Sequence, residues 1–455
     1  DCLGRIKLED RTQFATRWGF AFAAIGSAVG LGNIWRFPFM AGENGGGAFI
    51  SLYFIFILLF GIPALIAMIL IGRRGGKSPV GSTEGLAIAD GHSRNWKWLG
   101  WLTLSVAFFA LTFFSVVAGW VLAYLVKSIF GELVELSPAG SVDLFNLVKS
   151  DPLGMAFWHG VFMVLTMSIV ARGVRAGVER AVSLMMPALF VILLFLVAYA
   201  ALTADFYSAV QFMFVPDFDR LDSQVVLLAL GQAFFSLSVG GGGIIAYGAY
   251  LQREASIPKT AVLIASANVS VDLLAGLAIF PIVFAYGLQA GAGPGLLFEA
   301  LPVAFGQMPG GQIIGSLFFV LVLFAALSTS ISMLESVVSR LVERPGVTRV
   351  GMTLRAGSLI WFFGLGSVFS YNLLADFEPL AFIAMFEGFT IFRLVDFFVV
   401  NVLILTSALL LTIFVGYVMS GQATQEEWGG DHVLFRLWRF NMRYIAPPVI
   451  LLIFV

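Results

Sequence analysis

The sequence has little charge, one cysteine and only three histidines. Asp, Glu, Lys and Arg make up 12% of the 455 residues, against roughly 25% in soluble domains. The lone Cys2 excludes an intramolecular disulfide and a cysteine-rich metal site. The histidines lie far apart, and no His-Glu-x-x-His or Gly-x-Ser-x-Gly motif is present, so nothing in the sequence supports an enzyme. Low charge and a mean hydropathy of +0.95 instead predict an integral membrane protein.

Apolar runs recur along the whole chain. Each is long enough to cross the roughly 30 Å of hydrocarbon in a bilayer, which takes about 20 residues. We count eleven, near residues 13–40, 47–72, 98–129, 153–171, 179–203, 224–251, 260–290, 312–341, 350–371, 394–420 and 436–455. We therefore expect an all-α integral membrane protein of about eleven transmembrane helices, forming a single domain over residues 1–455.

Lys and Arg concentrate on one side of the expected membrane. With a cytoplasmic N-terminus, the inner segments hold 21 of the 26 Lys and Arg residues. An excess of basic residues marks cytoplasmic loops, and residues 1–12 are too polar for a cleavable signal peptide. We expect a multi-pass protein with its N-terminus in the cytoplasm.

Glycine interrupts two of the apolar runs at corresponding positions. The first run contains GSAVGLGN (26–33) and the sixth contains SLSVGGGG (236–243). Five helices per half give two repeats of opposite topology, here near 13–203 and 224–420, with an extra helix near 436–455. Unwound backbone is tolerated in a membrane only where it lines a cavity or binds a ligand. Two facing breaks predict a midplane site for a small ion-coupled substrate, and close helix packing at glycine is the alternative.

The same residues resemble the neurotransmitter:sodium symporter family, which shares the fold of the bacterial leucine transporter. The stretch GSAVGLGNIWRFPFMAGENGGGAF (26–49) is close to a family signature, and GQAFFSLSVGGGGIIAYGAY (231–250) is similar to its sixth helix. The resemblance extends over essentially the whole chain. It implies a sodium-coupled symporter, and no enzyme, in a bacterial cytoplasmic (inner) membrane. Such a protein is a monomer or weak dimer that binds a small zwitterion and no nucleic acid.

The resemblance implies two sodium sites built from oxygen ligands. The first would use the Ala28 carbonyl with the side chains of Asn33, Ser236 and Asn268. The second would use the carbonyls of Gly26, Val29 and Ala325 with the hydroxyls of Ser328 and Thr329. The alternative for a hydroxyl in a membrane helix is a bond to a carbonyl of the preceding turn.

The resemblance also implies a set of substrate contacts. Monoamine-transporting members carry an aspartate at position 30, so Gly30 implies a substrate that brings its own carboxylate. The backbone N–H groups of Leu31 and Gly32 would bind that carboxylate. The full set comprises Ser27, Ala28, Gly30, Leu31, Gly32, Ala110, Phe114, Phe235, Ser236, Ser238, Gly241, Thr329 and Met333.

The pocket residues predict the kind of substrate. Gly241 and Ala110 replace bulkier residues of the leucine-selective member, and Met333 adapts to irregular shapes, so we expect a large apolar pocket for a bulky hydrophobic or aromatic amino acid. Phe114 stands where the family places a tyrosine that hydrogen-bonds the carboxylate. The missing hydroxyl leaves open a carrier of a non-standard zwitterion, such as an amino-acid derivative, betaine or sulfonated amine. A non-transporting sensor of the same fold is a further alternative.

Asp272 is an acidic residue inside a predicted membrane helix, four residues after Asn268 and on the same helix face. Chloride-dependent family members have a neutral residue here, so the resemblance implies that chloride is not required. The carboxylate would either take up a proton during the return step or act as a fixed counter-ion.

Charged residues at both ends of the expected pathway resemble the family's gates. The resemblance pairs Arg36 with Asp396 at the outer entrance, above the aromatic lid of Phe235. At the inner side it pairs Arg11 with Glu343, with Tyr250 nearby. A solvated cytoplasmic charge is the alternative for Arg11 and Glu343.

Overall fold

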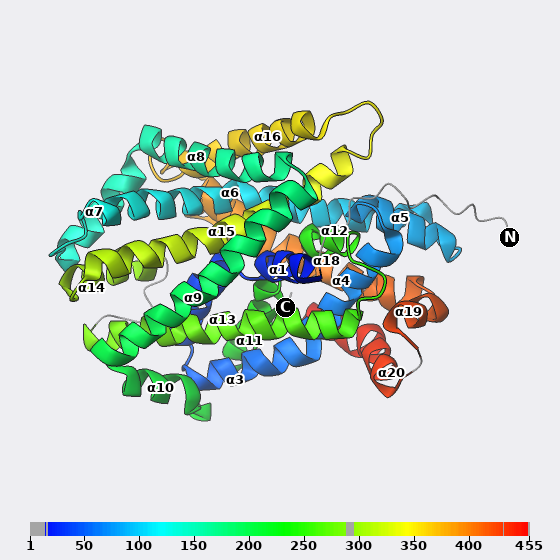
Figure 1. The fold of residues 1–455 in the computed structure, drawn as a ribbon, viewed down its shortest axis with the longest axis horizontal. Coiled ribbons are helices and arrows are strands. Elements are labelled where there is room, and N and C mark those ends of the chain that lie inside the picture. The colour runs from blue at the N-terminus through cyan, green and yellow to red at the C-terminus, as the bar shows by residue number, and fades with distance from the viewer. Residues whose placement is uncertain (1–13, 15–16, 288–294, 431, 454–455) are drawn as a thin grey trace.

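The computed structural model describes residues 14, 17–287, 295–430 and 432–453. In these ranges the chain is helical and contains no β-strand. The long helices run roughly along the long axis of the molecule (Figure 1). Eight continuous helical stretches in the described ranges are long and apolar enough to cross a membrane: Gly47–Gly75, Arg94–Ile129, Pro152–Ala171, Val174–Thr203, Ile257–Ala285, Gly311–Leu341, Arg349–Phe369 and Ile391–Val418.

The elements before the second break are given first, with η marking short 3₁₀- and π-helices. They are α1 (Arg17–Ala28), η2 (Gly32–Arg36), α2 (Phe37–Glu43), α3 (Gly47–Phe56), η3 (Ile57–Gly61), α4 (Ile62–Gly75), α5 (Pro79–Ala89), η4 (Arg94–Trp96), α6 (Lys97–Ile129), α7 (Pro138–Ser150), α8 (Pro152–Ala171), η5 (Val174–Glu179), α9 (Arg180–Thr203), α10 (Phe206–Phe214), η6 (Phe218–Arg220) and α11 (Ser223–Ser236).

The remaining elements follow that break. Its elements are α12 (Gly242–Gly248), α13 (Ile257–Ala285), η7 (Leu296–Ala300), α14 (Leu301–Gln307), α15 (Gly311–Leu341), α16 (Arg349–Phe369), η8 (Ala384–Phe386), α17 (Ile391–Phe397), η9 (Phe398–Leu403), α18 (Ile404–Ile413), η10 (Phe414–Val418), α19 (Gly421–Trp428), α20 (Val433–Phe440), η11 (Asn441–Ile445) and α21 (Ala446–Ile453).

Both predicted helix breaks are present. The axis bends by 50° between Trp18–Ala28 and Gly32–Glu43. In the sixth predicted span, α11 ends at Ser236 and α12 begins at Gly242. Between them Ser238 has a φ of 51° and Gly240 a φ of 85°, values that cannot continue a right-handed helix. The glycine-rich stretches therefore end the helices where the sequence predicted.

The two spans that contain the glycine breaks, near 13–40 and 224–251, are not single continuous helices. The span near 224–251 divides into α11 and α12, because the left-handed backbone at Ser238 and Gly240 stops helix propagation. The span near 436–455 is continuous over its described residues, where α20, η11 and α21 follow one another without a gap. The total of about eleven spans stays a prediction.

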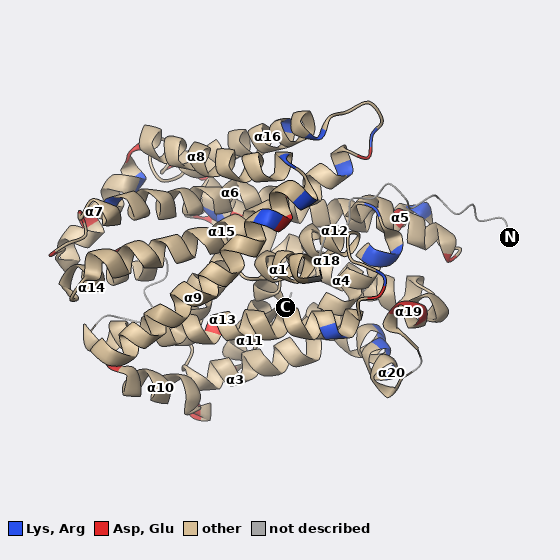
Figure 2. Ribbon diagram, in the orientation of Figure 1, with Lys and Arg blue, Asp and Glu red and all other residues tan. Residues whose placement is uncertain are grey.

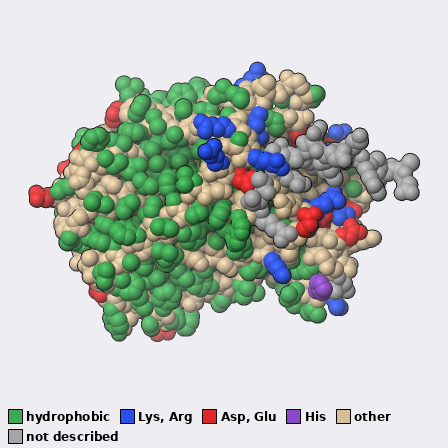
Figure 3. Space-filling view, viewed as in Figure 1, with side chains coloured by type: hydrophobic (Ala, Val, Ile, Leu, Met, Phe, Trp, Pro, Cys, Tyr) green, Lys and Arg blue, Asp and Glu red, His purple; other side chains and the backbone are tan. Residues whose placement is uncertain are grey.

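The surface divides into an apolar body and a charged end. Hydrophobic side chains cover most of the face seen in Figure 3, and on α9 Leu184 and Val191 are 70% and 66% exposed. Exposure of such side chains is expected where lipid is the solvent. Figure 2 shows most Lys and Arg gathered at the end of the molecule that holds α5, α19 and α20.

Candidate functional site

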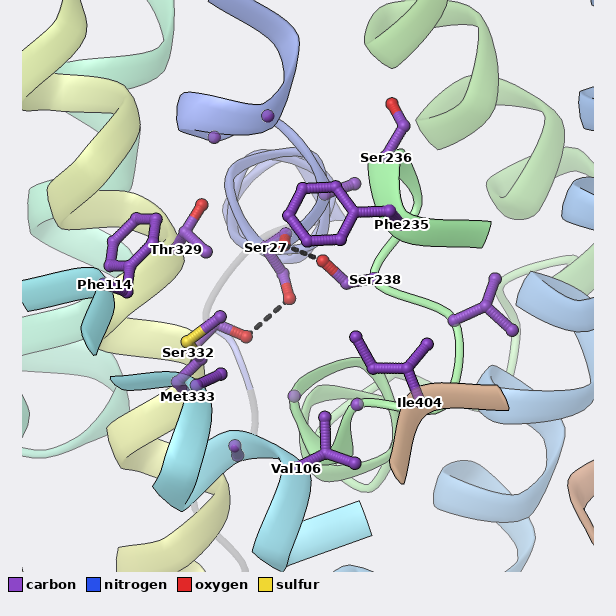
Figure 4. A pocket seen from close by; sticks show the side chains of 18 of the residues that line it. Ser27, Val106, Phe114, Phe235, Ser236, Ser238, Thr329, Ser332, Met333 and Ile404 are labelled. Atoms are coloured by element: carbon purple, nitrogen blue, oxygen red, sulfur yellow. Dashed lines mark hydrogen bonds between the residues drawn. The ribbon is translucent and has the colours of Figure 1, made fainter. Parts of the chain in front are cut away.

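One cavity lies between the two helix breaks (Figure 4). It is walled by α1, η2, α6, α11, α12, α15, η9 and α18, together with the segments that join the broken helices. Every residue predicted to contact substrate lies on this wall, which also includes Val106, Ala107, Phe113, Val239, Gly242, Gly243, Ser332, Val399 and Ile404. These further residues were not predicted to contact substrate. Most are apolar side chains of membrane helices, which look like ordinary packing residues in the sequence, and the exceptions are Gly242, Gly243 and Ser332.

Two glycines of the first break are required by close approach of neighbouring side chains. A Cβ on Gly30 would lie 2.4 Å from Thr329 Oγ1, and a Cβ on Gly32 would lie 2.8 Å from Phe235 Cε1. Both distances are shorter than any normal contact. The absence of a side chain therefore lets the unwound backbone touch α15 on one side and the Phe235 ring on the other.

The five residues predicted for the second sodium site converge at the end of α1. Ser328 Oγ lies 3.3 Å from the Val29 carbonyl oxygen and 3.0 Å from that of Ala325. Thr329 Oγ1 lies 3.2 Å from the Val29 oxygen and 3.5 Å from the Gly26 oxygen. The hydroxyls donate to these carbonyls, so oxygen atoms from α1 and α15 already surround one point.

The side chains predicted for the first sodium site form one buried network. Asn33 Nδ2 donates to Ser236 Oγ at 3.1 Å and to Asn268 Oδ1 at 2.9 Å. Asn268 Nδ2 donates to Ser236 Oγ at 2.7 Å. Asn33 Oδ1 also accepts from the Gly30 backbone N–H at 2.8 Å, so the network is fixed to the unwound backbone of the first break, where the Ala28 carbonyl lies.

Asp272 is the charged centre of this network and is fully buried. Its oxygens accept from Asn33 at 2.8 Å, from the Tyr53 hydroxyl at 2.5 Å and from Asn268 at 3.2 Å. The Tyr53 and Ser236 hydroxyl oxygens lie 2.9 Å apart. Tyr53 was missed by the sequence analysis, because a tyrosine in an apolar helix resembles any other core aromatic residue.

Gln232 is a second missed residue, one turn before Ser236 on α11. Its side chain is 1% exposed, and both its amide nitrogen and its amide oxygen lack a hydrogen-bond partner within the described part of the chain. A buried unpaired amide is unusual, and no contact within the described part of the chain accounts for it.

At the outer entrance Arg36 lies over Phe235, with 4.2 Å between the guanidinium carbon and the ring centroid. Asp396 is near enough to interact electrostatically with Arg36, but they make no direct ion pair within 4.0 Å among the described residues. The structure brings the two predicted gate residues to the same entrance without joining them.

At the inner end Arg11 lies outside the described residues, and so does its predicted pairing with Glu343. Glu343 itself accepts from the Ser78 N–H at 2.7 Å, from the Ser78 hydroxyl at 2.9 Å and from Arg340 at 2.8 Å. A carboxylate at the first turn of α5 is stabilised by the helix dipole.

Tyr250 lines the same inner pocket as Glu343, as the resemblance implied, and it hydrogen-bonds another carboxylate. Its hydroxyl donates to Glu335 at 3.1 Å, and Glu335 also pairs with Arg349 at the start of α16. Phe14, which is buried, packs its ring 6.1 Å from that of Tyr250. The sequence analysis missed the Glu335–Arg349 pair, since no local spacing connects the ends of α15 and α16.

Comparison with known proteins gives a consistent result. Residues 11–137 and 148–455 match the model of the sodium:neurotransmitter symporter family. A sodium-dependent transporter of Bacillus subtilis, YhdH, is 38% identical over 97% of both chains, and one of Haemophilus influenzae is 32% identical over 98% of both. The crystal structure of MhsT in complex with L-phenylalanine superposes with a TM-score of 0.89 at 38% identity, covering 98% of this chain and 99% of that one.

These matches confirm the all-α membrane fold with discontinuous helices that the resemblance implied. Sodium dependence appears in the names of both bacterial relatives. The oxygen-rich clusters at the two breaks are the features of this structure that suit such an ion. The chain belongs to the sodium:neurotransmitter symporter family and is a sodium-dependent membrane symporter.

Proposed function

We propose that this symporter imports a neutral, bulky hydrophobic or aromatic amino acid. The observation that carries the proposal is the character of the cavity wall. It is apolar along α6 and η9, where Val106, Ala110 and Val399 lie, and its polar groups lie at the helix breaks and on α15. A ligand that fits must join one compact zwitterionic end to a large apolar side chain. The L-phenylalanine bound to MhsT is such a ligand.

The zwitterionic end would lie at the first break. Its carboxylate would accept from the N–H groups of Leu31 and Gly32, and its amino group would donate to Ser238 and to the carbonyls of Ala28 and Phe235. Ser238 is held in place, because its hydroxyl donates to the Ser27 carbonyl at 3.0 Å. Phe114 lines the same cavity but offers no hydroxyl, so the carboxylate would depend on backbone and sodium.

Sodium would occupy two sites, one at Ala28, Asn33, Ser236 and Asn268 and the other at Gly26, Val29, Ala325, Ser328 and Thr329. Chloride would not be required, because the buried Asp272 carboxylate already supplies a negative charge beside the first site. Whether that carboxylate exchanges a proton is a separate property, which this proposal does not need.

The protein would work in a bacterial inner membrane with its N-terminus in the cytoplasm. The basic end of the molecule (Figure 2) supports this orientation, since cytoplasmic loops carry an excess of Lys and Arg. Sodium would favour the outward-facing state and substrate would let the outer entrance close between Arg36 and Asp396. Such coupling requires sodium to bind the two states with different affinity.

Thermal stabilisation of the purified protein tests the proposal. We expect L-phenylalanine, L-tryptophan and L-leucine to raise the melting temperature in sodium and not in potassium, because ligands of the folded state stabilise it by mass action. Glycine and alanine should give little effect. A sodium-dependent response to betaine or a sulfonated amine alone would instead favour the second candidate, which rests on Phe114. Stabilisation without any uptake into liposomes would favour a sensor.

A further inference from the structure

The apolar cavity has a polar floor made by two serine hydroxyls. Ser27, in the last turn of α1, and Ser332, on α15, both line the cavity, and their hydroxyl oxygens lie 2.5 Å apart. Figure 4 shows both side chains turned toward each other beneath Phe235 and Ser238. Ser332 follows Thr329 by three residues on the same helix face, one turn beyond the second sodium cluster.

The floor is closed by α12, which comes unusually near. A Cβ on Gly243 would lie 2.0 Å from Ser332 Oγ and 3.0 Å from Ser27 Oγ. Three helices therefore meet at the hydroxyl pair, and only a residue without a side chain fits between them. The pair is 2% exposed at each serine, so little beyond a ligand in the cavity could reach it.

The hydroxyls of this floor are not fully satisfied. Each serine hydroxyl has one proton to donate and two lone pairs to accept with, so the single bond between Ser27 and Ser332 uses one of two protons. The Tyr247 hydroxyl lies near Ser332. Buried polar groups are normally paired, and a purely apolar ring laid on this floor would leave these groups unpaired.

We propose that the Ser27–Ser332 pair recognises a hydroxyl on the ring of an aromatic amino acid, which makes Ser332 a specificity-determining residue. A phenolic oxygen can accept the spare proton and donate its own, so it matches what the floor offers. A bare phenyl ring does neither, and an indole N–H can only donate. The inference rests on the proposed function and sharpens its substrate class.

Competition for bound radiolabelled L-phenylalanine in sodium tests this inference. L-tyrosine and 4-fluoro-L-phenylalanine are similar in size and differ in the hydroxyl. We expect wild-type protein to bind L-tyrosine roughly threefold to tenfold more tightly than the fluoro compound, as one net hydrogen bond allows. Ser332→Ala should abolish the difference while leaving 4-fluoro-L-phenylalanine within about twofold of wild type.

Two further variants serve as a control and a second test. Ser336 is one turn beyond Ser332 on α15, outside the cavity, and its hydroxyl donates to the Met333 carbonyl of its own helix at 2.7 Å. Ser336→Ala should therefore keep the tyrosine preference. Ser27→Ala removes the other hydroxyl of the pair and should abolish the tyrosine preference.

Each outcome separates this inference from the proposed function. Equal affinity for the two competitors in wild-type protein, or an unchanged preference in both Ser332→Ala and Ser27→Ala, would overturn the inference and leave the proposed function intact. If L-phenylalanine does not bind and no other aromatic amino acid binds either, the proposed function and the inference are both wrong.

Discussion

At the scale of single residues, contact between Gly30 and Thr329 links the helix break to the second sodium cluster. The Thr329 hydroxyl lies 3.2 Å from the Val29 carbonyl oxygen, the residue directly before Gly30. A side chain at position 30 would enter the space that this hydroxyl occupies. The hydroxyl cannot move aside and still point at the carbonyls, so this glycine serves the ion cluster as well as the break.

We expect Gly30→Ala to weaken apparent sodium affinity by about tenfold or more, the equivalent of about 1.4 kcal/mol. The measurement is the melting temperature of the purified variant across a sodium titration. Gly85→Ala is the control, because a Cβ on Gly85 meets nothing within 4 Å. Sodium stabilisation of Gly30→Ala that matches wild type would show that the Thr329 hydroxyl is not a sodium ligand.

Asp272 is surrounded by donors that would also suit an anion. Asn33, Tyr53 and Asn268 all point to its carboxylate. Charge-assisted hydrogen bonds of this kind are worth about 1.5–3 kcal/mol each. Replacing Asp272 by a smaller neutral residue would leave these three donors without an acceptor, beside the first sodium site.

We therefore expect Asp272→Ser to make uptake chloride-dependent. Exchanging chloride for gluconate should lower its sodium-driven uptake by roughly tenfold, or about 1.4 kcal/mol, and leave wild type unchanged. Asp143→Ser, on the exposed face of α7, is the charge-matched control. Equal uptake of Asp272→Ser in both anions would contradict the assigned role of Asp272.

At the scale of elements, the two helix breaks were predictable and their exact geometry was not. Clustered glycine in an apolar run is a local signal, and both breaks occur there. The left-handed conformation of Ser238 has no such signal, because serine rarely adopts it. Its hydroxyl bond to the Ser27 carbonyl joins two chain segments that are distant in sequence.

Gly240 gives the second break a direct test. Its φ is 85°, and a Cβ there would lie 2.7 Å from the Ile404 carbonyl oxygen of α18. Gly310 has a φ of 66°, and a Cβ added to it would meet nothing within 4 Å. An alanine at position 310 therefore has the same left-handed backbone strain as one at position 240 but no clash with a neighbouring helix. Gly310→Ala should cost about 1–2 kcal/mol, and Gly240→Ala distinctly more.

The readout for this pair is the melting temperature of each variant in the same detergent and sodium concentration. The difference between the two variants isolates the contact of the break with α18. Equal losses would mean that α18 moves away freely and does not hold the second break in place.

At the scale of the whole molecule, the sequence predicted what local patterns encode. Apolar runs gave the membrane class, and the glycine stretches with Asn33 and Asn268 gave the family and a set of residues that the structure gathers around one cavity. The Glu335–Arg349 pair, the unpaired Gln232 amide and the Ser332 floor depend on contacts between distant helices. Such contacts leave no pattern in one sequence, so only the fold reveals them.

The central claim is that sodium drives the accumulation of a hydrophobic amino acid. The most direct measurement is uptake of radiolabelled L-phenylalanine into proteoliposomes containing the purified protein, with an inward gradient of sodium or of potassium. We expect accumulation above the external concentration only with the sodium gradient, and its collapse when an ionophore dissipates that gradient. Equal uptake in potassium, or equilibration without accumulation in sodium, would contradict the account.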